Sequence, residues 1–152
     1  MARINWTRVI LGGLLAGVVI NIVEALVNGL LLADQWAAGM KALHQSPDLG
    51  IVPYTMFWLW GFLTGIFAMW LYATIRPRFG PGPRTAVIAA IATWVPGSLL
   101  ASMAPMALHL FPRRLFAIGV AGALVETIAG TLLGAWLYKE REPAPRATSA
   151  AA

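Results

Sequence analysis

Long uninterrupted apolar blocks are the dominant pattern along this chain. Four of them cover residues 9–33, 52–75, 86–110 and 115–138. Each is long enough to cross about 30 Å of hydrocarbon, which takes roughly 20 helical residues. Each must also be helical, because an isolated strand would leave its backbone polar groups unpaired in lipid. The pattern therefore predicts an all-α bundle of four transmembrane helices joined by short loops.

The ends of the chain complete the expected organisation. We predict a single transmembrane domain over residues 1–142. Residues 143–152 are rich in alanine and proline and contain no large apolar side chain. A segment of this kind cannot bury enough apolar surface to offset its loss of conformational entropy. We therefore expect it to form a disordered tail.

Composition supports the membrane interpretation. Hydrophobic residues make up 59% of the 152 residues and charged residues 11%, against roughly 25% charged in an average soluble domain. So few charges cannot cover the surface of a water-soluble domain of this size. Cysteine is absent, which excludes disulfides, thiolate metal sites and a cysteine nucleophile.

Basic residues set the expected orientation. Eight of them flank one side of the predicted spans and three flank the other. The positive-inside rule places the richer side in the cytoplasm, and with it both termini. Because these residues sit at the ends of apolar blocks, we expect them to contact lipid headgroups and not nucleic acid. The eight are Arg3, Arg8, Arg76, Arg78, Arg84, Lys139, Arg141 and Arg146, and the three are Lys41, Arg113 and Arg114.

The two longer connections differ in character. Residues 76–84 are basic and contain three prolines, which favour a stiff loop because proline cannot continue a helix. In the other connection, Trp36, Met40 and Leu43 recur at helical spacing. This spacing predicts a short helix near residues 35–45 that lies on the outer membrane surface. Tyr72 and Tyr138 fall at the predicted inner interface, where such rings anchor helices at headgroup depth.

Two carboxylic acids lie inside the predicted spans, and they are the strongest candidates for a functional site. Ionisable groups at this depth are costly and are functional hypotheses by default. Glu24 lies roughly 14 Å from the outer end of the first helix, and Glu126 roughly 16 Å from the outer end of the fourth, at 1.5 Å per residue. The two carboxyls are therefore expected at nearly one depth.

Small and polar residues follow the same two helix faces. In the first helix Gly13, Gly17, Asn21, Glu24 and Asn28 recur at steps of three or four, as Gly119, Gly122, Glu126, Gly130 and Gly134 do in the fourth. Such steps keep side chains on one face. Small residues let helices approach closely, and asparagine or glutamate can bond across the contact. We expect the two faces to turn inward and toward each other.

The carboxyl pair has two interpretations. Two close carboxyls in a low dielectric cannot both ionise easily, so at least one would hold a proton, as in a proton- or cation-handling site. Alternatively, a protonated pair, or a bond from glutamate to Asn21 or Asn28, could simply hold the two helices together. Water reaching Glu24 would favour the first interpretation, and a dry, tightly packed contact the second.

Other candidate features carry less chemistry. Pro96, Gly97 and Pro105 predict a kinked third helix, and Gly61 and Gly65 form a small-residue packing motif in the second. His44 and His109 lack the spacing of a metal or haem site. The chain carries no recognisable catalytic motif. We therefore expect no cofactor, no metal, no catalytic residues and no enzymatic activity.

Several stretches resemble a known group of sequences when taken together. They are residues 4–13 (INWTRVILGG), 21–24 (NIVE), 72–84 (the basic loop with its flanks) and 134–140 (GAWLYKE). The chain resembles a family of small, uncharacterised bacterial four-helix integral membrane proteins. This resemblance implies an inner-membrane location and brings no activity or binding residues.

The sequence thus favours a structural or accessory membrane component, with a small proton-coupled transporter or channel using Glu24 and Glu126 as the alternative. The lipid bilayer is its expected partner. The glycine-rich faces suggest in addition a homo-oligomer or a larger membrane complex.

The basic asymmetry makes the topology testable. Reporter fusions placed in the 76–84 loop and after the C-terminal tail should both report the cytoplasm, because both segments belong to the basic side. A fusion at residue 46, in the predicted outer loop, provides the matched control and should report the opposite compartment. A periplasmic signal from either of the first two fusions would contradict the four-span arrangement.

Overall fold

The structure is a computed structural model that describes residues 4–139, and all its regular elements are helical. Two of the helices, η1 and η2, are π-helices that continue α1 and α4 without a break. The elements are α1 (Trp6–Glu24), η1 (Ala25–Leu31), α2 (Ala33–Ala42), α3 (Ile51–Phe79), α4 (Pro83–Trp94), η2 (Val95–Leu100), α5 (Met103–Ala107) and α6 (Arg113–Leu137). The predicted tail at 143–152, and residues 140–142 of the predicted domain, lie outside the described residues.

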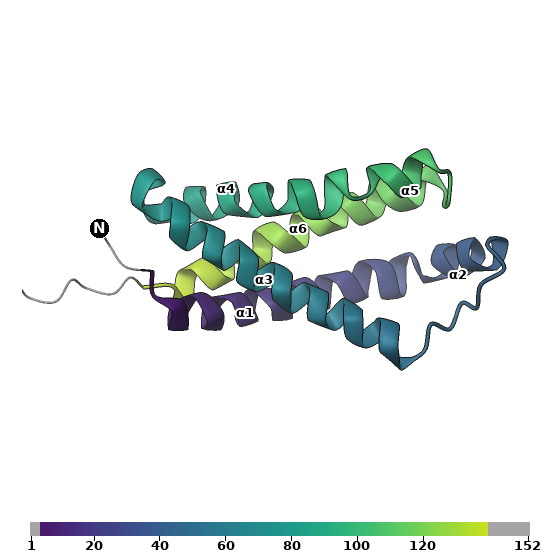
Figure 1. Cartoon of the computed structure of the whole chain (residues 1–152), viewed down its shortest axis with the longest axis horizontal. Helices are drawn as coiled ribbons and strands as arrows, with labels where there is room; N and C mark the ends of the chain where they lie inside the picture. Colours follow the sequence, from purple (N-terminus) through teal and green to yellow (C-terminus); the bar gives the residue numbers. More distant parts are fainter. Residues whose placement is uncertain (1–3, 140–152) are drawn as a thin grey trace, which may run out of the picture.

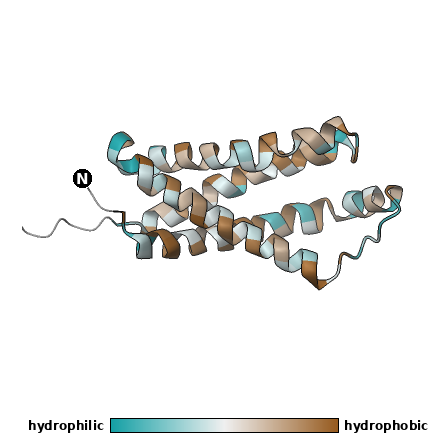
Figure 2. Cartoon of the chain, in the orientation of Figure 1, coloured by the Kyte–Doolittle hydropathy of each residue, from teal (hydrophilic) through white to brown (hydrophobic). Residues whose placement is uncertain are grey.

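Four continuous helical spans are long and apolar enough to cross a membrane. They are Trp6–Leu31, Ile51–Phe79, Pro83–Ala107 and Arg113–Leu137. The predicted all-α bundle of four spans is therefore confirmed, and the chain is a multi-pass membrane protein. Figure 2 shows apolar residues along most of each span, with hydrophilic residues near the helix ends and in the loop after α2. The helix expected near residues 35–45 is present as α2.

The spans are arranged around α1, which packs against both α3 and α6, while α4 packs against α6 and α3. Figure 1 shows α3 crossing α1 obliquely. The start of α1, the turn between α3 and α4, and the end of α6 lie together, and we call this the basic end. The opposite end holds α2, α5 and the start of α6.

Close contacts between helix backbones hold the basic half together. A Cβ atom at Gly134 would lie 2.5 Å from the carbonyl oxygen of Gly12, and one at Gly130 would lie 2.8 Å from that of Ala16. On the other side of α1, a Cβ at Gly13 would lie 2.5 Å from Ile66 Cα in α3. Lipid provides little hydrophobic drive for helix association, so this close fit is the main source of cohesion.

One prediction about these faces is wrong in part. Gly13 and Gly17 pack against α3 at Ile66 and Phe62, and not against α6. Contact with α6 falls instead on Gly12, Ala16 and Ile20. The reason is that α3 and α6 lie side by side along α1: positions 12, 16 and 20 meet α6, whereas the adjacent positions 13, 17 and 21 meet α3. Gly122, Gly130 and Gly134 do face α1, as predicted.

Helix boundaries differ from the sequence prediction at two places. α3 was expected to end at residue 75, but it continues through Pro77 to Phe79. A proline in the last turn removes one backbone hydrogen bond, and the helix tolerates that loss near its end. The third span was expected to be helical over residues 86–110, but it widens into η2 at Pro96 and ends at Ala107. The backbone is therefore irregular where the kink was predicted, and the irregularity is a π-helix.

Two tyrosines expected at the membrane interface are buried instead. Tyr72 and Tyr138 are 3% and 5% exposed, and their rings pack edge to face at a centroid distance of 5.8 Å. The Asn5 backbone N–H donates to Tyr138 Oη at 3.3 Å, which ties the start of α1 to the end of α6. The Arg76 guanidinium lies 5.4 Å from the centre of the Tyr138 ring. These tyrosines therefore belong to the core of the basic end.

The α1–α6 contact makes a direct prediction for Gly134. Gly134→Ala should lower the free energy of unfolding by about 1–3 kcal/mol, because the added methyl meets the backbone of α1 and the sulfur of Met69. Gly29→Ala is the matched control, since nothing lies within 4 Å of a Cβ at Gly29. Denaturant unfolding in detergent measures both. Equal effects at the two positions would show that the α1–α6 contact is looser than described.

Candidate functional site: a carboxyl pair inside the membrane spans

Glu24 and Glu126 are the only acidic residues within the four spans. Glu24 is the last residue of α1 and is half-buried. Glu126 lies at the middle of α6 and is 7% exposed. Glu126 thus lies near the middle of its span, and Glu24 lies seven residues before Leu31, where the first span ends.

Contacts on either side of Glu126 fix where it meets the first span. One turn toward the basic end, Gly130 packs against Ala16 and Ile20. One turn the other way, Gly122 packs against Val27, with a Cβ-to-Cβ distance of 3.5 Å. Because Glu126 lies between these contacts on the same face, it meets the first span at the level of Glu24. Glu24 and Glu126 thus lie at the same level of the contact between the first span and α6, near enough for each carboxyl to affect the other.

The hydrogen-bonding capacity of the Glu126 carboxyl is incompletely satisfied. Its Oε2 atom is buried and has no hydrogen-bond partner among the described residues. A buried polar atom without a partner costs about 1–3 kcal/mol, and more when charged. Such groups are rare in native structures, and a functional role or an exchangeable proton is one of the usual reasons for them. This atom is the strongest sign of chemistry within the spans.

Asn28 connects the site to α2. Its side chain is within hydrogen-bonding reach of the Glu24 carboxyl. On its other side, the Trp36 indole N–H donates to Asn28 Oδ1 at 3.0 Å. Trp36 packs edge to face on Phe111, with ring centroids 4.9 Å apart. α2 is therefore held against both the first span and the segment just before α6, a role for Trp36 that the sequence analysis did not find.

Asn21 belongs to a different contact from the one predicted. Its Nδ2 donates to the carbonyl oxygens of Gly17, at 2.8 Å, and of Trp58, at 3.2 Å. A Cβ at Gly61 would lie 2.5 Å from Asn21 Oδ1, so the absence of a side chain at Gly61 makes room for the amide. Asn21 therefore joins α1 to α3 and is not part of the carboxyl site.

The backbone changes form directly after Glu24. The π-helix η1 covers Ala25–Leu31, and none of its residues is buried. Segments with π-helical hydrogen bonding are uncommon and are frequently found at functional sites. The sequence does not predict η1, because the apolar pattern of the first span continues through it.

Metal-ligating residues are scattered over the described part of the chain. Residues 4–139 contain no group of three or more His, Cys, Asp or Glu that could hold a metal ion. His44 and His109 lie in separate connections, each with a positive φ angle, of 56° and 53°. The site thus consists of Glu24, Glu126 and Asn28, with Trp36 bonded to Asn28.

The fold and this site define a small multi-pass membrane protein with a carboxyl pair between its first and last spans. Comparison with protein-family models, with curated proteins and with solved structures found no match.

The contact beside the carboxyl pair can be tested by cross-linking, because the chain has no native cysteine. In the double variant Val27→Cys and Gly122→Cys, the Cβ atoms would lie 3.5 Å apart, within the range of a disulfide. Oxidation should link the two cysteines within one chain, which a protease cut between them reveals on a gel.

The control for this cross-link pairs Val27→Cys with Gly97→Cys. Nothing lies within 4 Å of a Cβ at Gly97, so this pair should stay reduced. A linked dimer in place of the linked monomer would show that α6 meets the first span of another chain.

Proposed function

We propose that this chain is a transporter or channel of the bacterial inner membrane, with both termini in the cytoplasm, that takes up and releases a proton or cation at Glu24 and Glu126. The observation that supports this proposal most is the buried, unpartnered Oε2 atom of Glu126 beside a second carboxyl. A proton or a cation is the ligand that such a pair of oxygens would accept.

A purely adhesive role explains the carboxyls less well. A protonated pair that holds two helices together is expected to make a hydrogen bond across the contact. Glu126 Oε2 makes none to the described residues. The cohesion of α1 with α6 has another source, which is the approach of Gly130 and Gly134 to the α1 backbone. The carboxyls are therefore free to serve another purpose.

The two halves of the bundle differ in packing, and this difference suggests the route by which a proton reaches the pair. The buried core cluster lies in the basic half and includes Val9, Ala16, Met69, Ala86 and Ala89. In the other half, no residue of η1, η2 or α5 is buried. We propose that exchange occurs through the loosely packed half, from the end that holds α2.

A second candidate is a structural or accessory membrane component, and one observation favours it. The first ten residues of α3 are exposed around the helix, apart from Pro53. Among them Tyr54, Phe57, Trp58 and Trp60 are each more than half exposed. A second copy of the chain, or another membrane protein, could cover this segment in a homo-oligomer or a larger complex.

Replacing Glu126 distinguishes the two candidates. Glu126→Gln keeps the shape and hydrogen-bonding capacity of the side chain, so stability should change by less than about 1 kcal/mol. The glutamine cannot exchange a proton, so proton flux into liposomes carrying the purified protein and an internal pH dye should fall to the level of empty liposomes. Asp34→Asn, which removes an exposed carboxyl in the first turn of α2, is the control and should keep full flux.

Infrared difference spectra of the same proteins at acid and alkaline pH provide an independent measurement. The band of a protonated carboxyl should weaken on the alkaline side in the unaltered protein and in Asp34→Asn, and should be reduced in Glu126→Gln. If the unaltered protein shows neither flux nor a pH-dependent band, the transport proposal fails and the structural candidate stands.

A further inference from the structure

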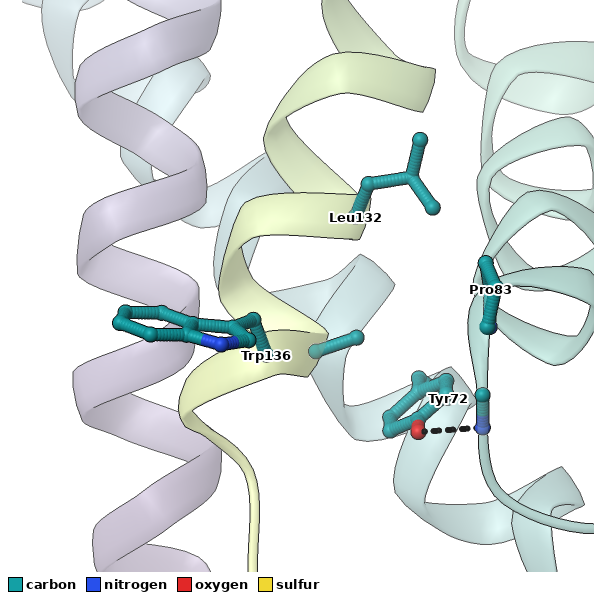
Figure 3. A pocket seen from close by; sticks show the side chains of 6 residues that line it. Tyr72, Pro83, Leu132 and Trp136 are labelled. Carbon is teal, nitrogen blue, oxygen red and sulfur yellow. Dashed lines mark hydrogen bonds between the residues drawn. The ribbon is translucent and has the colours of Figure 1, made fainter.

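A cavity at the basic end lies far from the carboxyl pair. Its volume is about 320 Å³, and it is bounded by the end of α3, the start of α4 and the end of α6. The lining residues are Tyr72, Gly82, Pro83, Leu132, Ala135 and Trp136. In Figure 3 the Leu132 side chain points toward α4, and the Gly82 N–H donates to Tyr72 Oη at 3.3 Å. The walls are therefore mainly apolar, with their polar groups already bonded to each other.

Side chains of α6 beside the cavity are exposed on the outside of the bundle. Trp136 is 79% exposed, and its ring extends away from Pro83 (Figure 3). The neighbouring Leu133 is 47% exposed. In a four-span membrane protein, exposed apolar side chains on a helix face hydrocarbon, and an exposed tryptophan at a helix end sits at headgroup depth. The natural occupant of such a cavity is an amphipathic molecule from the bilayer.

Positive charge predominates at the end of the bundle that holds the cavity. Arg84 directly follows the lining residue Pro83 and is exposed, and Lys139 is exposed three residues after Trp136. Arg8, Arg76 and Arg78 belong to the same end. Among residues 4–139, this end carries no acidic side chain, since Asp34 and Asp48 lie beyond the first span and Glu24 and Glu126 lie within the spans. In the sequence that follows, Glu140 and Glu142 are matched in number by Arg141 and Arg146. An anionic group is therefore the complementary partner.

We propose that this cavity binds an anionic phospholipid. The phosphate would lie at headgroup depth against Arg84 and Lys139, and an acyl chain would enter the cavity beside Leu132 and Pro83. Basic pockets between transmembrane helices are known sites for anionic headgroups. A zwitterionic lipid has the same apolar part but lacks the net charge, so it would bind more weakly. The proposal does not depend on the carboxyl pair or on any activity.

Native mass spectrometry of the full chain in detergent, titrated with phosphatidylglycerol or phosphatidylcholine, tests this proposal. Phosphatidylglycerol should bind at least several-fold more tightly, and Arg84→Gln should weaken its binding roughly five-fold, the effect of one basic residue near the surface. Arg113→Gln is the matched control, because Arg113 is an exposed arginine at the opposite end. It should leave this binding unchanged.

A second pair of variants tests the cavity itself. Leu132→Trp fills the space beside Pro83 and should weaken binding of phosphatidylglycerol, whereas Leu133→Trp adds the same bulk to an exposed neighbour and should not. Equal binding of the two lipids, or equal losses in Arg84→Gln and Arg113→Gln, would overturn the proposal. If Leu132→Trp fails to fold, the surface variant Arg84→Gln decides the question alone.

Discussion

Backbone-to-backbone contact at glycine is the constraint on which the rest of this structure depends. Apolar side chains gain little by leaving lipid for each other, so helices in a membrane associate where they can approach closely. α1 achieves this on two sides, through Gly12 toward α6 and through Gly13 toward α3. These contacts make α1 the centre of the bundle. They also fix the register of α6 along α1, and the register decides which side chains meet at the middle of the membrane.

The carboxyl pair is a consequence of that register. Gly122 and Gly130 bring α6 against the first span one turn before and one turn after Glu126, and the acidic side chain fills the interval between them. Glu126 is thereby held against the first span, with only 7% of its surface exposed. Glu24 stands where the packed half of the bundle ends and the π-helix begins. The pair therefore lies where the buried core cluster ends and the π-helix, which has no buried residue, begins.

Hydropathy alone was enough to predict the four spans, and antiparallel geometry was enough to place Glu24 and Glu126 at one depth. The partners of each face were harder to predict. Gly13 and Gly17 meet α3 because α3 and α6 lie side by side along α1, and no local pattern decides which of the two helices a given position meets. Tyr72 and Tyr138 resembled interface anchors, and only their contact across 66 positions of sequence shows that they are buried.

Departures of the backbone from a regular α-helix were the other feature that could not be predicted from the sequence. The apolar pattern runs unchanged through η1, so nothing distinguishes a π-helix from an α-helix there. Pro77 suggested the end of a helix and is instead accommodated within the last turn of α3. Pro96 did signal a disturbance, because a residue without an N–H must alter the hydrogen bonding around it. The form that the disturbance takes depends on neighbouring side chains.

The length of α3 has a consequence for the membrane that surrounds the protein. Its 29 residues span about 44 Å at 1.5 Å per residue, whereas an average hydrocarbon core measures about 30 Å. A helix with such an excess tilts, or thickens the bilayer near it, at a cost of fractions of a kcal/mol per Å. The first ten residues of α3 are largely exposed, and the hydrogen bond from Asn21 to the Trp58 carbonyl is the contact that a tilt of this segment would strain. Bilayer thickness would thus act on this protein mainly through α3.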